Sequence, residues 1–177
     1  MKLQNLKLGK GVLVIVVLVV LIAAKTTGTK SKVGYINTNE LWSVMPEKQA
    51  ADLELKKMEE QMIAYYQQEQ KTFEAGINAY VRDSSAMTEL VKKQTIQKLQ
   101  QQQDNIQSLP QAANEELAKK QEALYAPIRE KMQKAIDEVA KENGYDYILD
   151  AAYGNIVYAG NEGDNVISLV KVKLGLK

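Results

Sequence analysis

An uninterrupted apolar run stands near the start of the chain. It covers 13 residues, from Val12 to Ala24, and three lysines precede it. A helix of this length would span about 20 Å, less than the roughly 30 Å of a bilayer's hydrocarbon core. The pattern therefore favours a signal peptide over a permanent membrane span. No Ala-x-Ala triplet follows, so an uncleaved signal anchor is the alternative interpretation of residues 1–24. Both interpretations send the rest of the chain across a membrane.

After a polar linker over residues 25–32, the pattern predicts a strand and a short helix. Residues 33–37 are rich in β-forming side chains and predict the strand. Asn37 is expected to cap a helix over Thr38–Val44, with Glu40 completing a pair similar to a capping box. Pro46 then suits the first position of a new helix. Residues 33–45 are thus expected to form the first strand and helix of a small body.

The next hundred residues predict a long helical hairpin. From Glu47 to about Arg82, apolar residues recur at spacings of three and four, so one helix face is apolar and the rest is charged. A helix of about 36 residues would be about 54 Å long and must project from so small a body. The helix-capping side chains of residues 82–85 predict the turn. The arm is therefore expected over residues 46–143, with its tip near residues 82–88.

The returning helix is expected from Leu90 onward and is rich in glutamine. The apolar residues embedded among the glutamines favour a solvated helix face over a low-complexity segment. Pro110 removes a backbone donor and predicts a kink or an interruption. Pro127 predicts a second kink, because the apolar stripe continues in phase across it. Asn143 and Gly144 give the expected end of the helix.

Residues 144–177 are expected to complete the body. Tyr145–Asp150 predicts a strand, and Ile156–Ala159 predicts its hairpin partner after a turn at residues 153–155. Asp164 is expected to cap a last helix over Asn165–Leu174, with Val166, Ile167, Val170 and Leu174 on one face. The predicted fold class is α+β and predominantly helical: a long antiparallel helical hairpin on a small β body built from both ends of the chain.

Composition removes most catalytic and metal-binding chemistry. The chain has no histidine and no cysteine, which excludes thiol nucleophiles, imidazole bases, disulfides and the usual zinc sites. Adjacent acid pairs such as Glu59-Glu60 and Glu115-Glu116 diverge by about 100° on a helix, so they indicate solvated faces. The run over residues 161–165 lacks the alternating ligands of a calcium loop. We therefore expect no enzyme, no cofactor and no bound metal.

Charge and side-chain size point to protein partners. Without residues 1–24 the chain has 20 basic and 22 acidic residues, a net charge of −2, which does not favour nucleic-acid binding. The two helices of the hairpin are expected to cover most of each other's apolar stripe. Flexible methionines and amphipathic tyrosines nevertheless crowd the outer half of the arm, beyond what two helices can cover. The candidate partner contacts are Met58, Met62, Tyr65, Tyr66, Phe73, Ile77, Tyr80 and Met87.

The segment Leu124–Asp150 resembles the end of the Skp/OmpH family of periplasmic chaperones. Residues 33–37, followed by Leu41 and by Met45-Pro46-Glu47, resemble that family's first strand and helix start. Asp164–Leu174 resembles its closing helix. The resemblance spans essentially the whole chain after the leader, and it is most specific from Leu124 to Asp150.

The resemblance implies a homotrimer in which three helical arms extend from a shared β body and enclose a cavity. Members of the family hold unfolded outer-membrane proteins there, without ATP, and keep them from aggregating in the periplasm. The body and trimer contacts would be Val33, Tyr35, Ile36, Tyr147, Ile148, Leu149, Ile156 and Val157. Unlike the strongly basic members of the family, residues 47–143 contain 14 basic and 17 acidic residues, so lipopolysaccharide is a doubtful partner.

The alternative function is a membrane-anchored coiled-coil scaffold or stalk of the cell envelope. In that case residues 12–24 would stay in the bilayer and provide the only membrane contact. This alternative explains the poor cleavage region and the glutamine-rich helix. It does not explain why one strand precedes the hairpin and two follow it.

Overall fold

The structure, a computed structural model, describes residues 31–160 and 164–176. The expected leader, residues 1–24, and the linker up to residue 30 lie outside the described residues. Every described helix and strand belongs to one unit of the chain, which begins at Val33. Within the part that the structure describes, no helix combines the length and the apolar character needed to cross a bilayer.

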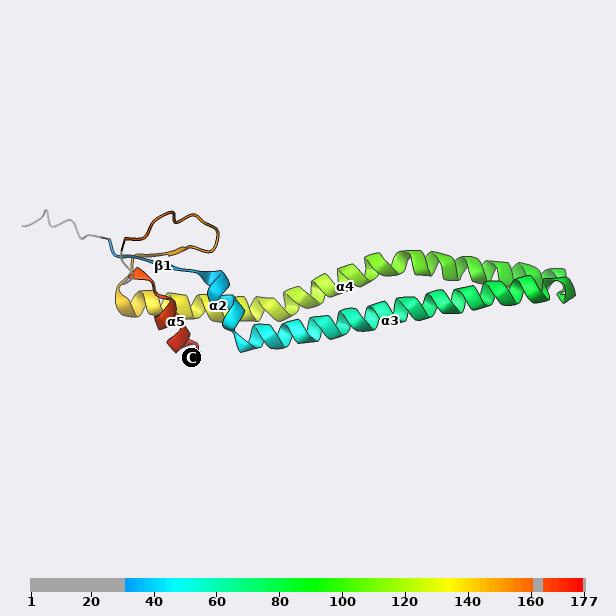
Figure 1. Ribbon diagram of the computed structural model, residues 1–177, viewed down its shortest axis with the longest axis horizontal. Coiled ribbons are helices and arrows are strands. Elements are labelled where there is room, and N and C mark those ends of the chain that lie inside the picture. Colours follow the sequence, from blue (N-terminus) through cyan, green and yellow to red (C-terminus); the bar gives the residue numbers. More distant parts are fainter. Residues whose placement is uncertain (1–30, 161–163, 177) are drawn as a thin grey trace, which may run out of the picture. The chain divides into compact units, whose positions relative to one another are not determined.

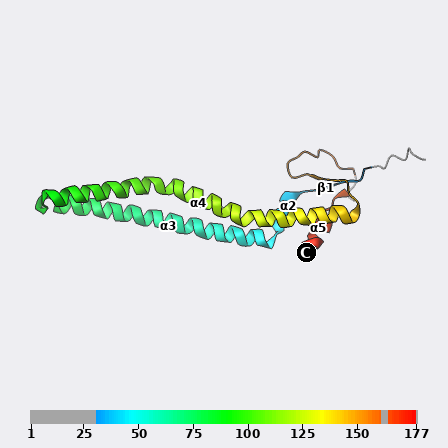
Figure 2. The same ribbon diagram turned by 180° about the vertical axis from the view of Figure 1, so that it is seen from behind.

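This unit consists of long helices and a small sheet (Figure 1). Its elements are β1 (Val33–Ile36), α2 (Thr38–Val44), α3 (Pro46–Asp83), the 3-10 turn η1 (Ser84–Ala86), α4 (Glu89–Asn143), β2 (Tyr147–Asp150) and α5 (Ile167–Lys173). Figures 1 and 2 show α3 and α4 running side by side from the body to the tip. At 38 residues, α3 is about 57 Å long. The predominantly helical fold with its small sheet is confirmed.

The helix starts follow from local capping. The Asn37 side chain accepts a hydrogen bond from the backbone N–H of Glu40 at 3.1 Å. Glu40 does not complete the capping box, because its carboxylate pairs with Lys171 of α5 at 2.8 Å. Pro46 opens α3, where its missing N–H costs no hydrogen bond. The cap of the returning helix is Thr88, whose hydroxyl accepts from the N–H of Val91, and not a residue of the 82–85 segment.

The two strands form a parallel pair although the long hairpin separates them in sequence. Val33 lies opposite Tyr147, and Ile36 lies opposite Asp150. The pairing is parallel because α4 runs past the base of α3 to the far end of the body, so the chain enters β2 at the end where β1 begins (Figure 1). On the other edge of β1, the Tyr35 carbonyl accepts from the N–H of Val166 at 2.9 Å.

The strand predicted over Ile156–Ala159 is wrong, because the described segment 151–160 forms no strand. A hairpin partner needs an apolar surface to pack against. Val157 is 96% exposed and Tyr158 is 86% exposed, so neither side chain gains burial that would offset the cost of ordering the segment. The preceding strand begins at Tyr147 and not at Tyr145, because Gly144 and Tyr145 close the end of α4 with hydrogen bonds to its last carbonyls.

The last helix starts later than expected, and Asp164 does not cap it. Its first residue is Ile167, and the Asn165 side chain accepts from the N–H of that residue at 3.0 Å. Asn165 itself forms a bridge with Tyr35, which keeps its backbone out of the helix. The predicted apolar face is correct in that Val166, Ile167 and Val170 are buried and Leu174 packs beside them.

The core lies in the body, where α2, the end of α4 and α5 meet the sheet. Its main cluster consists of Ile36, Leu41, Ala135, Ile136, Val139, Val166, Ile167 and Val170. A smaller cluster of Met45, Ala51 and Ile128 closes the root of the arm. Leu174 and Leu176 pack against both clusters, so the C-terminal segment ties the body to the arm.

Asp150 joins the end of β2 to the start of α2. Its carboxylate accepts hydrogen bonds from the Thr38 backbone N–H at 3.2 Å, from the Thr38 hydroxyl at 2.6 Å and from the Ala152 N–H at 2.9 Å. Burial acts to raise the pKa of Asp150, but these hydrogen bonds outweigh it and place the pKa below its ordinary value.

The depressed pKa predicts an acid-sensitive contribution of Asp150 to stability. The carboxylate stabilises the fold fully above its unfolded pKa of about 4, and this contribution is lost as the pH falls through the lower folded pKa. Urea unfolding of the native protein and of Asp150→Asn, at neutral pH and at steps below pH 4, measures it. We expect the native protein to lose free energy of unfolding more steeply with falling pH than the variant does. Parallel pH profiles would contradict this role.

Candidate functional site: the helical arm

The arm is an antiparallel pair of helices that meet along a narrow seam. The half-buried positions of α3 include Leu55, Met58, Met62, Tyr66, Glu69, Phe73, Gly76 and Tyr80. Those of α4 include Lys92, Thr95, Leu99, Gln102, Ile106, Leu109, Ala113 and Leu117. Both series consist of steps of three and four, which is the period typical of a coiled coil.

The seam is shallow and partly polar. Over residues 52–127, all of which the structure describes, no residue is buried. Glu69 and Gln102 occupy seam positions where a coiled coil usually has apolar side chains. The helices approach closely at Gly76, because a Cβ there would lie 2.9 Å from Cδ2 of Leu99. The arm therefore holds together by shallow contacts between the two helices and has no buried core of its own.

The root of the arm is fastened by a small polar cluster. The Tyr125 hydroxyl of α4 donates to Asp52 of α3 at 2.6 Å, and Lys48 pairs with the same carboxylate. Lys48 and then Tyr125 lower the pKa of Asp52, while the bond to Asp52 raises the pKa of Tyr125. The Trp42 ring of α2 meets the Tyr125 ring edge-on, with 5.3 Å between centroids. These contacts fix the angle at which the arm leaves the body.

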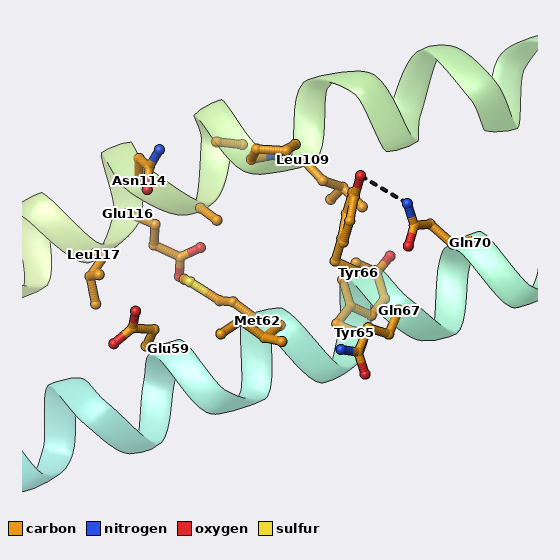
Figure 3. A pocket seen from close by; sticks show the side chains of 14 residues that line it. Glu59, Met62, Tyr65, Tyr66, Gln67, Gln70, Leu109, Asn114, Glu116 and Leu117 are labelled. Atoms are coloured by element: carbon orange, nitrogen blue, oxygen red, sulfur yellow. Dashed lines mark hydrogen bonds between the residues drawn. The ribbon is translucent and has the colours of Figure 1, made fainter.

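Midway along the arm, α3 and α4 part and leave a cavity of about 580 Å³, which we call the Pro110 hollow (Figure 3). Pro110 cannot donate a backbone hydrogen bond and crowds the preceding turn, which bends a helix. Figures 1 and 2 show α4 bowed away from α3 in this stretch, although the helix is continuous. Ala112 and Ala113 follow the proline, and their small side chains leave the space open.

The walls of the hollow are apolar with acidic and amide groups among them. The lining from α3 is Glu59, Met62, Ile63, Tyr65, Tyr66, Gln67 and Gln70. The lining from α4 is Leu109, Pro110, Ala112, Ala113, Asn114, Glu116 and Leu117. Among the described residues, no three acidic side chains gather as a metal site would require. The hollow can therefore accept an apolar group and offer hydrogen-bond acceptors at its rim.

The structure places the eight candidate partner contacts in three settings. Met62, Tyr65 and Tyr66 come together at the Pro110 hollow. The candidates that lie half-buried on the seam, facing α4, are Met58, Phe73 and Tyr80. Ile77 is exposed beside the seam, and Met87 is half-buried at the tip. Tyr65, at 56% exposure, is the most accessible of the eight.

Sequence reasoning missed several exposed apolar side chains of the arm. These are Leu53, Ile63, Val81, Leu90, Val91 and Ile96, which lie outside the main apolar stripe. The signal that could have identified them is an apolar residue out of phase with the stripe. Glu59 and Glu116 were also missed as a pair, because only the fold brings these two residues to one cavity.

The body candidates divide between the two faces of the sheet. Val33, Tyr35, Tyr147 and Leu149 share the outer face, in register across the two strands. Tyr147 is 63% exposed, so this face is open to contact. Ile36 and Ile148 pack toward the core of the same chain. Ile156 and Val157 lie in the loop that follows β2, where Ile156 is half-buried and Val157 is exposed.

Comparison with known proteins agrees with this arrangement. The family described as outer membrane protein (OmpH-like) matches residues 32–174. The crystal structure of a candidate outer membrane chaperone (OmpH-like) from Caulobacter crescentus CB15 has a similar fold, with a TM-score of 0.70 and 16% sequence identity over 82% of this chain and 85% of that chain. A search of curated proteins finds no significant match. The family match takes in every element from β1 to α5 and confirms the resemblance seen in the sequence, so the chain belongs to the OmpH-like family of outer membrane proteins.

Proposed function

We propose that this protein is an ATP-independent holdase of the periplasm that keeps unfolded outer-membrane proteins from aggregating. The observation that carries the proposal is that no residue of the arm is buried between Ala51 and Ile128, while apolar side chains such as Tyr65 and Ile77 are exposed. An arm of this kind offers an unfolded chain many weak apolar contacts. The family, and the chaperone named in the Caulobacter structure, support the same function.

The charge of the arm indicates how a client would be held. Residues 47–143 carry a net charge of −3, so a general attraction to anionic surfaces such as lipopolysaccharide is not part of the proposal. Capture rests on apolar contact and on confinement between arms. Met62 and Tyr65 suit clients of varied sequence, because methionine adapts its shape and tyrosine combines an apolar ring with a polar tip.

Three copies of the chain assemble, in this proposal, through the outer face of the sheet. An isolated two-stranded sheet is only marginally stable, and the β1–β2 pair has its core on one face alone. Val33, Tyr147 and Leu149 are exposed on the other face and would be covered by a neighbouring copy. A shared body of this kind would place three arms around one space, in which a client is kept from other unfolded chains.

Protein purified from cells that express the full chain should suppress the aggregation of a denatured β-barrel protein diluted from urea. We expect suppression at near-stoichiometric trimer, and native mass spectrometry should give the mass of three chains alone and of three chains with one client. Replacing Ile63, Tyr65 and Val81 by serine should weaken suppression at least about fivefold, because each change removes apolar contact area. The triple serine variant of the exposed polar residues Gln61, Gln68 and Asn78 is the matched control.

The outcomes separate the proposal from the envelope stalk. A protein with intact residues 12–24 that is recovered in membranes and leaves aggregation unchanged would favour the stalk. Equal suppression by the apolar-to-serine variant and its control would refute the assignment of the contact surface. A single-chain mass at working concentration would refute the shared body.

A further inference from the structure

The Pro110 hollow has the size and the walls of a binding site. Its volume of about 580 Å³ lies within the roughly 300–1,000 Å³ of pockets that take small ligands. Met62 from α3 and Leu109 and Ala113 from α4 give it apolar walls. Tyr66 also lines it, and its hydroxyl accepts a hydrogen bond from the Gln70 amide at 3.0 Å (Figure 3).

The charge of the hollow is one-sided. Glu59 of α3 and Glu116 of α4 both line the hollow, from opposite helices (Figure 3). No lysine or arginine lines the hollow, and neither carboxylate has a hydrogen bond or ion pair among the described residues. Lys56 and Lys120 on neighbouring turns pair with Glu60 and Glu54 instead. The hollow thus presents two carboxylates with no cation of their own.

This charge selects among possible occupants. A fatty acid or a lipid phosphate would bring a negative charge beside the two carboxylates. A second copy of the arm carries equal numbers of lysines and glutamates over residues 56–60 and 115–120, so charge does not favour it. A polypeptide segment that places an apolar side chain in the hollow and a lysine or arginine at its rim would instead satisfy both features. The exposed ring of Tyr65 adds a surface that attracts cations.

We infer that the Pro110 hollow is a receptor subsite for client segments in which an aromatic or large aliphatic side chain is flanked by lysine or arginine. The inference rests on the proposed holdase function and adds a sequence preference to it. The apolar side chain is desolvated between Met62 and Leu109, and the flanking cation lies between Glu59 and Glu116. Client capture is then not uniform along the arm, because one point on each arm prefers basic-aromatic segments.

The absence of cysteine from the chain gives a direct test. The Ala113→Cys variant places the chain's one thiol in the hollow, and the Ala123→Cys variant places it at an exposed position further along the same helix. Two short peptides are offered to each variant. Each contains one phenylalanine and one cysteine held as a mixed disulfide with a small thiol, which is released when the thiol of the variant attacks. Lysines flank the phenylalanine in one peptide, and glutamates flank it in the other. We expect the Ala113→Cys variant to capture the lysine peptide about five- to tenfold faster than the glutamate peptide, and the Ala123→Cys variant to show little preference.

Two further measurements test whether Glu59 and Glu116 cause the preference for the lysine peptide. Adding Glu59→Gln and Glu116→Gln to the Ala113→Cys variant should remove most of its preference, and raised ionic strength should reduce it. Equal capture of both peptides, or a disulfide between two Ala113→Cys chains in place of peptide capture, would overturn the inference. If aggregation of a β-barrel client is still suppressed in that case, only the subsite is refuted. If suppression fails as well, the holdase function itself is refuted.

Discussion

Replacing Leu41 by alanine is expected to lower the free energy of unfolding by about 2–5 kcal/mol. Leu41 is 0% exposed and lies in the main core cluster with Ile36 of β1 and Val170 of α5. Truncation removes apolar contact and leaves a cavity where α2, α4 and α5 meet. Urea unfolding followed by circular dichroism measures the change. Both proteins must be compared at one concentration, since self-association would make the measured stability depend on it.

Leu53→Ala is the matched control for this loss. The substitution is again leucine to alanine within a helix, but Leu53 is 70% exposed on α3. The expected change in the free energy of unfolding is within about 0.5 kcal/mol, as for most surface substitutions. A cost for Leu41→Ala no larger than that of Leu53→Ala would show that the body core does not stabilise the fold as described.

Pro110→Ala is expected to raise the free energy of unfolding by about 1–3 kcal/mol. Proline inside a helix costs about 3 kcal/mol relative to alanine, because it removes one backbone hydrogen bond and its ring crowds the preceding turn. Alanine would restore the hydrogen bond to the Ile106 carbonyl and allow α4 to straighten toward α3. The thermal unfolding midpoint and the urea midpoint both report this gain.

The stabilised variant should also bind less well at the hollow. A straighter α4 would bring Leu109 and Ala113 closer to Met62, so the cavity that the bend creates would shrink. We expect slower capture of the lysine peptide when Pro110→Ala is added to the Ala113→Cys variant. Gln107→Ala, at an exposed position one turn earlier, is the control and should leave stability and capture nearly unchanged. A destabilised Pro110→Ala chain would show that the bend is required for packing.

Much of the fold was predictable because its signals are local. Pro46 and Gly144 each act within one helical turn, and the alternation of three and four between them leaves few alternatives to a long hairpin. The same holds for β1, which follows a polar linker and ends at Ile36, directly before the capping residue Asn37. Where one residue and its near neighbours decide the backbone, the sequence is sufficient.

The errors concern residues whose partners lie far away in the chain. The segment Ile156–Ala159 has the composition of a strand, but no described surface of the chain covers Val157. Asp164 is a good capping residue, but Asn165 forms a bridge with Tyr35, so the helix starts later and the side chain of Asn165 accepts from the N–H of Ile167 instead. The Pro110 hollow depends on how α3 and α4 are aligned against each other. The proline alone therefore predicted a bend in the helix, but not the cavity beside it.

The parallel pairing of β1 with β2 also sets the order in which the molecule can form. Val33 pairs with Tyr147, and Tyr35 bonds to Val166, so neither edge of the first strand has a partner until more than a hundred further residues have been made. Contacts between residues this distant in sequence form late, because the intervening loop must close first. The contacts between α3 and α4 near the tip are local in sequence. The hairpin can therefore form from the tip toward the body before the strands pair. A chain emerging in order from its N-terminus therefore acquires its arm before its root, and its first strand remains unpaired until residues 147–150 have been made.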